Sequence, residues 1–360
     1  MFRSYSKLLK TFIGHTDRVR SVDYVTFDGG QFICSGSDDK TVRLWDVENN
    51  KQIQLFKGHP GYVYCVKFSL YHYHNRHRNV ISSSGDKTIR FWDIKDNAQL
   101  QMFNGGASEF CGIEFSSFNG GRYLCSGTYD NTIHLWDVET SNLLHIFNGH
   151  EGIVWCVDFS PSQSNNNHNE NKSNNIGVIG GNGYTICSGA GDKTIRTWDI
   201  ETTKQLTVFT GHRDFMRSVK YGSNELRNTG GANTILSGSQ DRSVRLWDIR
   251  SGQQIQAFSG HRDWIYAVEY SPFVIKNSEF GDSSNVVCSG SQDNTIRFWD
   301  VRSNKEELHV IKGDEKNDGI LCLKSMVLKT KEKNSKNTKN STYDLNLCYG
   351  SRNGPICIWG

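Results

Sequence analysis

Short runs in which polar and apolar residues alternate, separated by turn residues, cover most of this 360-residue chain. In one stretch the runs are VYCVKF (63–68), NVISSS (79–84), TIRFWD (88–93) and AQLQMF (98–103). Alternation of this kind is typical of β-strands with one buried face, and no helical apolar period of about 3.6 residues is sustained. The pattern predicts an all-β protein built from four-strand units, whose strands are termed a to d in chain order.

Strand c ends in a tryptophan in every unit, so the unit is a repeat. Successive tryptophans of this kind lie between 44 and 62 residues apart, and six of the seven are followed by aspartate. They are Trp45, Trp92, Trp136, Trp198, Trp247, Trp299 and Trp359. A four-strand unit of this size cannot bury its own faces and must stack on its neighbours.

Two further motifs recur in register with strand c. A Gly-His pair precedes strand a in five units, and Ser-Gly-Ser-x-Asp or a variant of it stands at the b to c turn. The pairs begin at Gly14, Gly58, Gly149, Gly211 and Gly260. With these motifs the chain resembles the WD-repeat β-propeller family over its whole length except a few loops. The resemblance implies a seven-bladed β-propeller with four antiparallel strands per blade.

The two ends of the chain have complementary patterns. Residues 8–15 (LLKTFIGH) look like a strand d with its following turn, whereas the C-terminal runs ILCLKSM, LNLCYGS and PICIW supply strands a to c without a strand d. An open sheet edge would leave backbone groups unpaired. We therefore expect residues 1–13 to supply the outer strand of the last blade, closing the ring, and residues 1–360 to form one propeller domain.

Composition and charge restrict the cellular compartments and the classes of partner that are expected for this protein. The net charge is +3, from 41 basic and 38 acidic residues, so no broad polyanion-binding surface is expected. No apolar run approaches the roughly 18 residues of a membrane-spanning helix, and there is no signal-peptide pattern. The 10 cysteines recur at equivalent strand positions without a CxxC pair, which favours buried thiols in a reducing compartment. We expect an intracellular protein, cytoplasmic or nuclear.

Five units contain a histidine from Gly-His, a serine ten residues before the tryptophan and an aspartate six before it. Ser, His and Asp are the residues of a catalytic triad, but five identical copies favour structure: a buried Asp–His–Ser–Trp relay of hydrogen bonds. In the family such a network is structural. The five sets are His15, Ser35, Asp39 and Trp45; His59, Ser82, Asp86 and Trp92; His150, Ser188, Asp192 and Trp198; His212, Ser237, Asp241 and Trp247; and His261, Ser289, Asp293 and Trp299.

Two points about the relay stay open at this stage. The serine eight residues before the tryptophan lies on the same face as the one ten before it, so either one fits the relay. The third unit has Gly106 in place of histidine, and the seventh has Asp314, Tyr349 and Asn353 at the three positions. The backbone amides of these two blades are expected to exchange their hydrogens faster than those of the other blades.

Signatures of catalysis and of cofactor binding are absent from the sequence. There is no GxxxxGK[ST] phosphate loop, GxSxG elbow or HExxH helix. The histidines His72, His74 and His77 have metal-like spacing but no acidic or thiol neighbour, so a solvated loop is favoured over a metal site. We expect no enzyme, no metal and no cofactor.

The segments that differ most in length from one unit to the next lie between strands a and b. Long inserts span 162–183 and 329–341, and shorter ones span 222–232 and 273–284. Their Asn, Lys and Ser content predicts mobile loops. In a propeller these loops share one rim, which leaves the opposite rim compact. The lysine-rich tract 329–339 is interpreted as a solvated loop rather than a site for nucleic acid.

The compact rim is the candidate binding surface. Residues that flank the inward-facing valine of strand a point toward this rim and the channel mouth. Together with one b to c turn residue they are Arg18, Arg20, Tyr62, Tyr64, Tyr129, Trp155, Phe215, Arg217, Trp264 and Tyr266. Aromatic residues and arginine dominate binding hot spots, whereas the alternative is that these rings only pack on each other. A partner segment carrying Arg or Lys would suit the rings through cation–π contacts.

The leading hypothesis is a non-catalytic scaffold, a monomeric propeller within a hetero-complex, whose rim binds peptide segments or loops of other proteins. The alternative is a reader of nucleic acid or phosphoinositides that uses Arg18, Arg20, Arg217 and the lysine-rich loop. Binding to phosphates would weaken steeply with added salt, whereas binding to an aromatic hot spot would not. The sequence identifies neither the partner nor the pathway.

Overall fold

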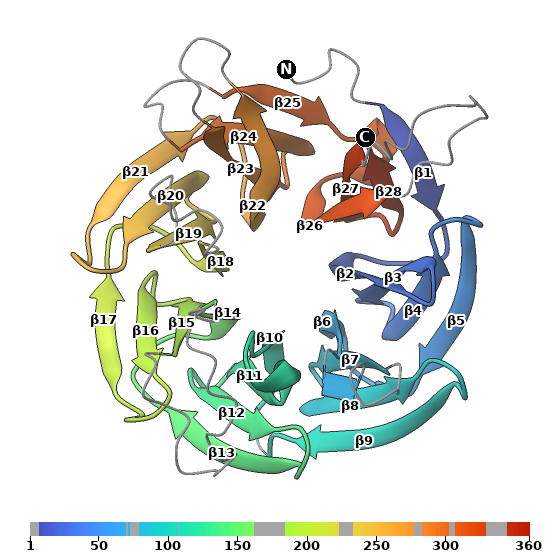
Figure 1. Cartoon of the computed structure of the whole chain (residues 1–360), viewed down its shortest axis with the longest axis horizontal. Helices are drawn as coiled ribbons and strands as arrows, with labels where there is room; N and C mark the ends of the chain where they lie inside the picture. The colour runs from blue at the N-terminus through green and yellow to red at the C-terminus, as the bar shows by residue number, and fades with distance from the viewer. Residues whose placement is uncertain are drawn as a thin grey trace, which may run out of the picture.

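The strands of the chain are arranged as blades around a central axis (Figure 1). The computed structural model describes residues 7–69, 71–72, 79–106, 108–161, 184–222, 233–276, 283–301, 307–328 and 344–360. Within these ranges the strands form seven four-stranded sheets, and every pair of neighbouring strands that is hydrogen-bonded is antiparallel.

Blades 1 to 6 each use four strands that follow one another along the chain, with the first strand innermost. Blades 1 to 3 contain β2 (Val19–Phe27), β3 (Gly30–Ser37), β4 (Thr41–Asp46) and β5 (Lys51–Lys57); β6 (Val63–Phe68), β7 (Asn79–Ser84), β8 (Thr88–Asp93) and β9 (Ala98–Asn104); and β10 (Phe110–Phe115), β11 (Tyr123–Thr128), β12 (Ile133–Asp137) and β13 (Asn142–Phe147). Blades 4 to 6 contain β14 (Val154–Phe159), β15 (Thr185–Ala190), β16 (Ile195–Asp199) and β17 (Gln205–Phe209); β18 (Met216–Tyr221), β19 (Thr234–Ser239), β20 (Ser243–Asp248) and β21 (Gln254–Ser259); and β22 (Ile265–Lys276), β23 (Ser283–Ser291), β24 (Thr295–Asp300) and β25 (His309–Lys312). Two short 3₁₀ turns, η1 (Asn119–Gly121) and η3 (Glu315–Asn317), lie in connections.

Blade 7 combines strands from both ends of the chain. Its order is β26 (Ile320–Leu328), β27 (Asp344–Ser351), β28 (Ile356–Trp359) and β1 (Leu8–Phe12). Strand β1 pairs antiparallel with β28, with Phe12 opposite Ile356. Lys7 and Gly360 also exchange both backbone hydrogen bonds, at 3.1 and 3.2 Å. The strand predicted within residues 8–15 is therefore present and lies at the outer edge of the sheet that holds the last tryptophan.

Each strand c tryptophan of blades 1 to 6 packs on a phenylalanine from the outer strand of the preceding sheet. The ring centroids of Phe12 and Trp45 are 5.5 Å apart, and those of Phe56 and Trp92 are 5.6 Å apart. The other four pairs are Phe103 and Trp136, Phe147 and Trp198, Phe209 and Trp247, and Phe258 and Trp299. The core therefore lies between blades, where each sheet buries the face that its neighbour leaves open.

The polar relay is present in five blades. In blade 1 the Trp45 Nε1–H donates to Ser35 Oγ (2.8 Å), Ser35 Oγ contacts His15 Nε2 (2.7 Å), and His15 Nδ1 contacts Asp39 Oδ2 (2.8 Å). The corresponding distances in blades 2, 4, 5 and 6 lie between 2.7 and 3.0 Å. A neutral imidazole with its hydrogen on Nδ1 satisfies both of its contacts. Each relay ties the d to a connection to the b to c turn.

The structure also identifies the serine of the relay, which the sequence leaves open. It is the one ten residues before the tryptophan. The serine eight before has another role: Ser37 Oγ donates to the Asp17 carbonyl (3.1 Å) and accepts from the Asp39 N–H (3.1 Å), so it stabilises the turn itself.

Blades 3 and 7 are held differently. In blade 3, Trp136 Nε1–H still donates to Ser126 Oγ at 3.1 Å, but Gly106 supplies no ring, and the buried Nδ1 of His134 has no hydrogen-bond partner. Blade 7, in which Asp314 and Asn353 replace the histidine and the aspartate, has different contacts at these positions. The buried Asn317 of η3 donates to Tyr349 Oη (3.2 Å) instead, while Asp314 caps η3 by accepting from the Lys316 N–H.

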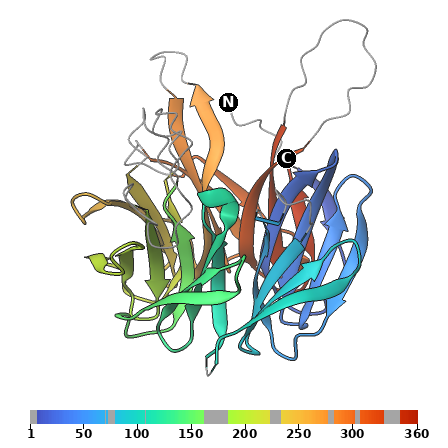
Figure 2. The same cartoon turned by 60° about the horizontal axis from the view of Figure 1, so that its bottom comes forward.

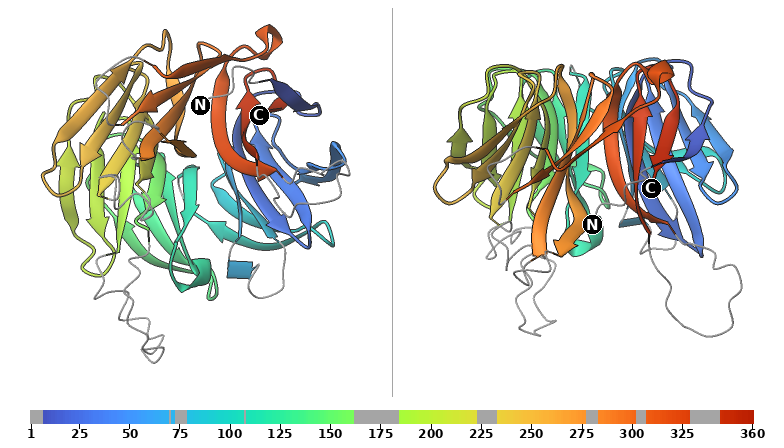
Figure 3. Two further views of the ribbon diagram at one scale, coloured as in Figure 1. Left: turned by 45° about the horizontal axis from the view of Figure 1, so that its top comes forward. Right: turned by 90° about the horizontal axis from the view of Figure 1, so that it is seen from above.

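The expected inserts have different outcomes. The prediction of a loop at 273–284 is wrong in part, because Val274, Ile275 and Lys276 continue β22 and pair with residues 283–285 of β23. Figures 2 and 3 show this hairpin projecting past the neighbouring blades on one face of the ring. Residues 162–183, 223–232 and 329–341 lie outside the described residues.

The relay serine carries two hydrogen bonds in a complete blade and one in blade 3. We therefore expect Ser188→Ala, which leaves Trp198 Nε1 and His150 Nε2 unpaired, to lower the free energy of unfolding about twice as much as Ser126→Ala. Each unsatisfied buried group costs about 1–3 kcal/mol. Urea unfolding followed by tryptophan fluorescence measures both variants. Equal losses would show that the histidine contact contributes nothing.

The relay also predicts a dependence of stability on pH. Burial lowers the pKa of His15, His59, His150 and His212 below the usual value. As the pH falls, the unfolded chain takes up protons at these sites before the folded chain does, so this contribution is complete above about pH 6.5 and is lost below it. We expect a lower melting temperature at pH 5.5 than at pH 7.5, and a smaller difference in His59→Gln. A melting temperature that rises on acidification would contradict this.

Candidate functional site

The innermost strands of the seven blades surround a channel with a cavity of about 190 Å³. Every one of these strands has a register shift at its beginning, for example between Val19 and Ser21 in β2 and between Met216 and Ser218 in β18. The shifts recur in β6, β10, β14, β22 and β26. A bulge of this kind redirects the extra residue, so that two consecutive residues, such as Arg20 and Ser21, both line the channel.

The bulge separates the predicted binding residues into two groups. Those at the bulge line the channel: Arg20, Tyr64, Trp155, Arg217 and Tyr266. A second group lies two positions earlier in the chain than the first group, before the strand begins and at the rim: Arg18, Tyr62, Phe215 and Trp264. The side chains of Tyr62, Phe215 and Trp264 are 47%, 39% and 39% exposed, respectively. Tyr129 stands in the b to c turn of blade 3.

The channel residues form a continuous cluster, here called the mouth cluster: Arg20, Tyr64, Tyr129, Trp155, Arg217 and Tyr266. The hydroxyls of Tyr64 and Tyr129 are 3.1 Å apart, and the rings of Tyr129 and Trp155 are 5.4 Å apart. The guanidinium of Arg217 lies 4.1 Å from the ring centroid of Trp155. For these inner rings, mutual packing therefore accounts for much of the arrangement, whereas the three rim aromatics extend into solvent.

Three of the b to c turns each add one polar group to the mouth cluster. Asp38 accepts two hydrogen bonds from Arg20, at 2.9 and 2.7 Å. Gln292 accepts from Tyr266 Oη at 3.2 Å. With its amide oxygen turned toward Arg217, Gln240 accepts from Nε (2.9 Å) and Nη2 (2.5 Å). The turn residues hold the channel side chains in fixed orientations.

Two arginines of the protein itself lie over rings of the mouth cluster. Arg217 lies over the rings of Trp155 and Tyr266, at 4.1 and 5.7 Å, and Arg20 lies 6.0 Å from the ring of Tyr64. The expected cation–π contacts are thus made by the protein's own arginines. Burial lowers the pKa of Arg217, but a guanidinium stays protonated in proteins. These ring faces are therefore already covered, and a contact between an Arg or Lys of a partner and the remaining rings stays a prediction.

A second level of charge lies deeper in the channel, four residues after the first residue of each inner strand. Its members are Asp23, Lys67, Glu114, Asp158, Lys220, Glu269 and Lys324. Glu114 contacts the ammonium groups of Lys67 (2.6 Å) and Lys220 (3.1 Å), and Lys324 pairs with Asp23 (3.2 Å). Sequence reasoning missed this charged ring, although its regular spacing from the start of strand a is visible in the sequence.

The charged ring shifts the ionisation of its members. Burial opposes ionisation of Glu114, but the ammonium groups of Lys220 and Lys67 hold its pKa well below the usual value. Burial raises the pKa of Asp158 against the attraction of Lys220. Ion pairs of this kind stabilise only while each charge keeps its partner.

Other candidate sites have less support from the described residues. No group of three or more His, Cys, Asp or Glu side chains in the described ranges is arranged to hold a metal ion. His72 Nδ1 lies 2.8 Å from Ser69 Oγ, while His74 and His77 fall outside those ranges, as does the tract 329–339. All ten cysteines are free thiols. In the part of the chain that the structure describes, no helix is long and apolar enough to cross a membrane.

The charged ring yields a test of its contribution to stability. Glu114→Gln leaves two ammonium groups without their shared carboxylate. We therefore expect the free energy of unfolding to fall by about 2 kcal/mol, which is less than the loss for a fully buried ion pair because this pair is partly solvated. Adding Lys67→Met removes one unmatched charge and is expected to restore part of the loss. The exposed Glu48→Gln serves as the control in urea unfolding. Equal stability of the Glu114 and Glu48 variants would rule out this role.

The family model described as the first β-propeller of IFT122 matches residues 2–300, a range that ends at the aspartate of the sixth Trp-Asp pair. WD repeat and SOCS box-containing protein 1 of Danio rerio is 39% identical over 64 residues, which is 18% of this chain and 15% of that protein. The human peroxisomal targeting signal 2 receptor is 38% identical over 61 residues, 17% of this chain and 19% of the receptor.

The E3 ubiquitin-protein ligase COP1 of Arabidopsis thaliana is 39% identical over 59 residues, 16% of this chain and 8% of the ligase. The chain thus spans less than a fifth of the length of each of these curated relatives.

Proposed function

We propose that this chain, which belongs to the family of the first β-propeller of IFT122 and is a WD-repeat β-propeller protein, is a non-catalytic scaffold. Its compact rim binds a peptide segment or loop of another protein. The observation that carries this proposal is the set of three exposed aromatic side chains around the channel mouth, Tyr62, Phe215 and Trp264.

These rim aromatics have the properties of binding anchors. Tyr62 packs edge-on against Tyr64, with ring centroids 6.5 Å apart, and Trp264 packs against Tyr266 at 6.3 Å. Two of the three exposed rings, those of Tyr62 and Trp264, are therefore supported by a ring of the mouth cluster. Large, pre-oriented aromatic side chains lose little conformational freedom when a partner covers them, and such residues contribute most of the affinity in protein interfaces.

The relatives favour recognition of proteins over catalysis. One of them is named as the receptor for a peroxisomal targeting signal. The match with COP1 covers 8% of that ligase, so its ligase activity is not carried over to this chain. The five Ser–His–Asp sets, which have the residue types of a catalytic triad, are used in the five relays.

The geometry gives less support to the alternative that the protein binds nucleic acid or phosphoinositides. Such a site needs several arginines or lysines free to contact phosphates. Arg20 is ion-paired with Asp38, and Arg217 is held between two aromatic rings. The lysine-rich tract 329–339 lies outside the described residues.

A triple variant of the rim tests the proposal. Tyr62→Ala, Phe215→Ala and Trp264→Ala together remove the exposed anchors, and since these side chains are partly solvated the fold is expected to tolerate the change. Affinity capture from cell extract, read by quantitative mass spectrometry, is expected to lose the wild-type partners at least tenfold.

The matched control is the triple variant Leu100→Ala, Leu206→Ala and Ile255→Ala. It removes three apolar side chains that are 52%, 53% and 51% exposed on the outer strands β9, β17 and β21. This control is expected to keep the wild-type partners. Retention of the same proteins by the rim variant would refute binding at this rim.

A further inference from the structure

Arg217 carries the one positive charge of the mouth cluster for which the described residues provide no carboxylate. Arg20 is neutralised by Asp38 through two hydrogen bonds. Glu109 accepts from Tyr64 Oη at 3.4 Å and forms no ion pair with Arg217. The polar partner of Arg217 is the neutral amide of Gln240. A largely buried guanidinium with only a neutral partner leaves one positive charge to be matched.

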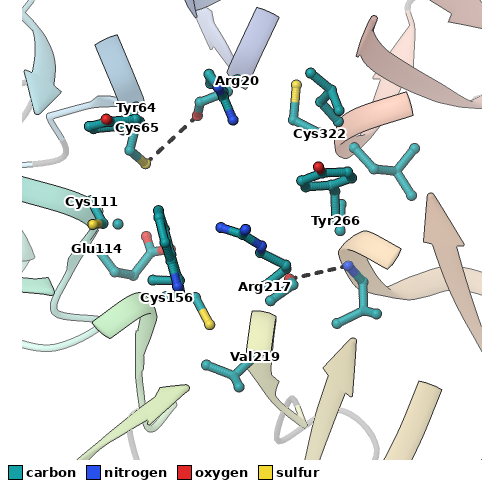
Figure 4. Close-up of a pocket in the computed structure, with 18 of the residues that line it drawn as sticks. Arg20, Tyr64, Cys65, Cys111, Glu114, Cys156, Arg217, Val219, Tyr266 and Cys322 are labelled. Carbon is teal, nitrogen blue, oxygen red and sulfur yellow. Dashed lines mark hydrogen bonds between the residues drawn. The ribbon is translucent and has the colours of Figure 1, made fainter. Parts of the chain in front are cut away.

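The orientation of Arg217 is fixed. The ring of Trp155 lies against it at 4.1 Å, the ring of Tyr266 lies at 5.7 Å, and Gln240 occupies the Nε and Nη2 positions. Figure 4 shows Arg217 and Arg20 pointing into the channel from opposite sides. The Nη1 donors of Arg217 are thereby left for a group that enters from the rim. A planar guanidinium held in this way is suited to a carboxylate, because its donor geometry matches the two oxygens.

The cavity that Arg217 lines extends to the deeper charged ring and is large enough for a side chain rather than for a folded element. The cavity of about 190 Å³ corresponds to roughly six water molecules at about 30 Å³ each. The rim aromatics Tyr62, Phe215 and Trp264 lie above it. A segment lying on these rings would place one of its side chains into the channel mouth.

We propose that the mouth cluster binds the carboxylate of an Asp or Glu side chain in the segment that the rim holds, with Arg217 as its main contact. This inference rests on the proposed function, since the segment is the one that the rim aromatics bind. The unmatched charge is a single one, which a carboxylate neutralises, whereas a phosphomonoester carries close to two negative charges at neutral pH. The site therefore selects an acidic residue at one position of the partner.

Selection from a random display library of 12-residue peptides on the wild-type protein tests the inference without knowledge of the natural partner. The expected result is a family of peptides with Asp or Glu at one fixed position, beside apolar residues that depend on Tyr62, Phe215 and Trp264. Peptides that need the rim aromatics but show no acidic position would overturn the inference and leave the proposed function standing. Failure to enrich any rim-dependent peptide would overturn both.

A selected peptide then allows a quantitative test by fluorescence anisotropy. Replacing its acidic residue by the isosteric Asn or Gln leaves the protein unchanged and is expected to weaken binding about 10- to 100-fold, the range for a charge-assisted hydrogen bond. Arg217→Gln is expected to produce a similar loss, and the two changes together little more than either alone. Arg250→Gln, which removes an exposed arginine in the c to d turn of blade 5, is the charge-matched control and is expected to bind normally.

Two results would refute the carboxylate assignment. One is independent, additive losses from the peptide and Arg217 changes, which would place the acidic residue elsewhere. The other is tighter binding when phosphoserine replaces the acidic residue, which would make the site one for a dianion.

Discussion

The rest of the structure depends on the buried strand c tryptophan. Its indole ring packs on a phenylalanine of the preceding sheet, as Trp45 does on Phe12 at 5.5 Å, and its Nε1–H is satisfied by a serine of its own sheet, Ser35, at 2.8 Å. The same serine contacts a histidine from the connection between blades. One side chain therefore fills the space between two sheets without leaving a buried donor unpaired, which would cost about 1–3 kcal/mol. No blade is complete without its neighbour.

This constraint acts on strands b, c and d and leaves the innermost strand free to vary. The relay positions hold the same residue types in five blades, whereas the bulge positions of the inner strands hold residues as different as Arg20, Tyr64, Cys111 and Leu321. The relay contacts and the proposed recognition residues thus belong to different strands of the same sheet. The bulge joins the two, because it turns a residue at the beginning of the inner strand toward the channel while the rest of the strand keeps its pairing.

The sequence predicts the parts of the fold that local rules determine. The four strands of a unit, the position of β1 and the members of the five relays follow from alternation and fixed spacing. The bulge does not follow from these rules. Uninterrupted alternation would place Arg18 and Arg20 on the same side of the strand, whereas the register shift between Val19 and Ser21 separates them. Asn317 was missed because it acts from a short 3₁₀ turn that has no equivalent in the other connections.

The extension of β22 and β23 shows how tertiary context overrides composition. Residues 283–285 (Ser, Ser, Asn) have low strand propensity, yet they pair with 274–276 because the preceding hairpin already fixes the register. The charged ring was missed for another reason. Its members are charged side chains at positions that alternation assigns to the inner face, and only the ring itself brings Lys67, Glu114 and Lys220 from three blades close enough to pair.

The two levels of the channel carry different sets of charged side chains, and under the proposed function this difference limits how deep a partner side chain enters. At the mouth, Arg20 is paired with Asp38, whereas Arg217 has only the neutral amide of Gln240 as a polar partner and Glu109 accepts from the Tyr64 hydroxyl. In the deeper ring, four carboxyl groups face three ammonium groups, and the ion pairs among them already use the lysines. An anionic group is therefore attracted to Arg217 at the mouth and repelled by the excess of carboxyl groups in the ring below it. The site proposed for a carboxylate therefore lies at the level of Arg217, next to the rim that carries the exposed aromatic side chains.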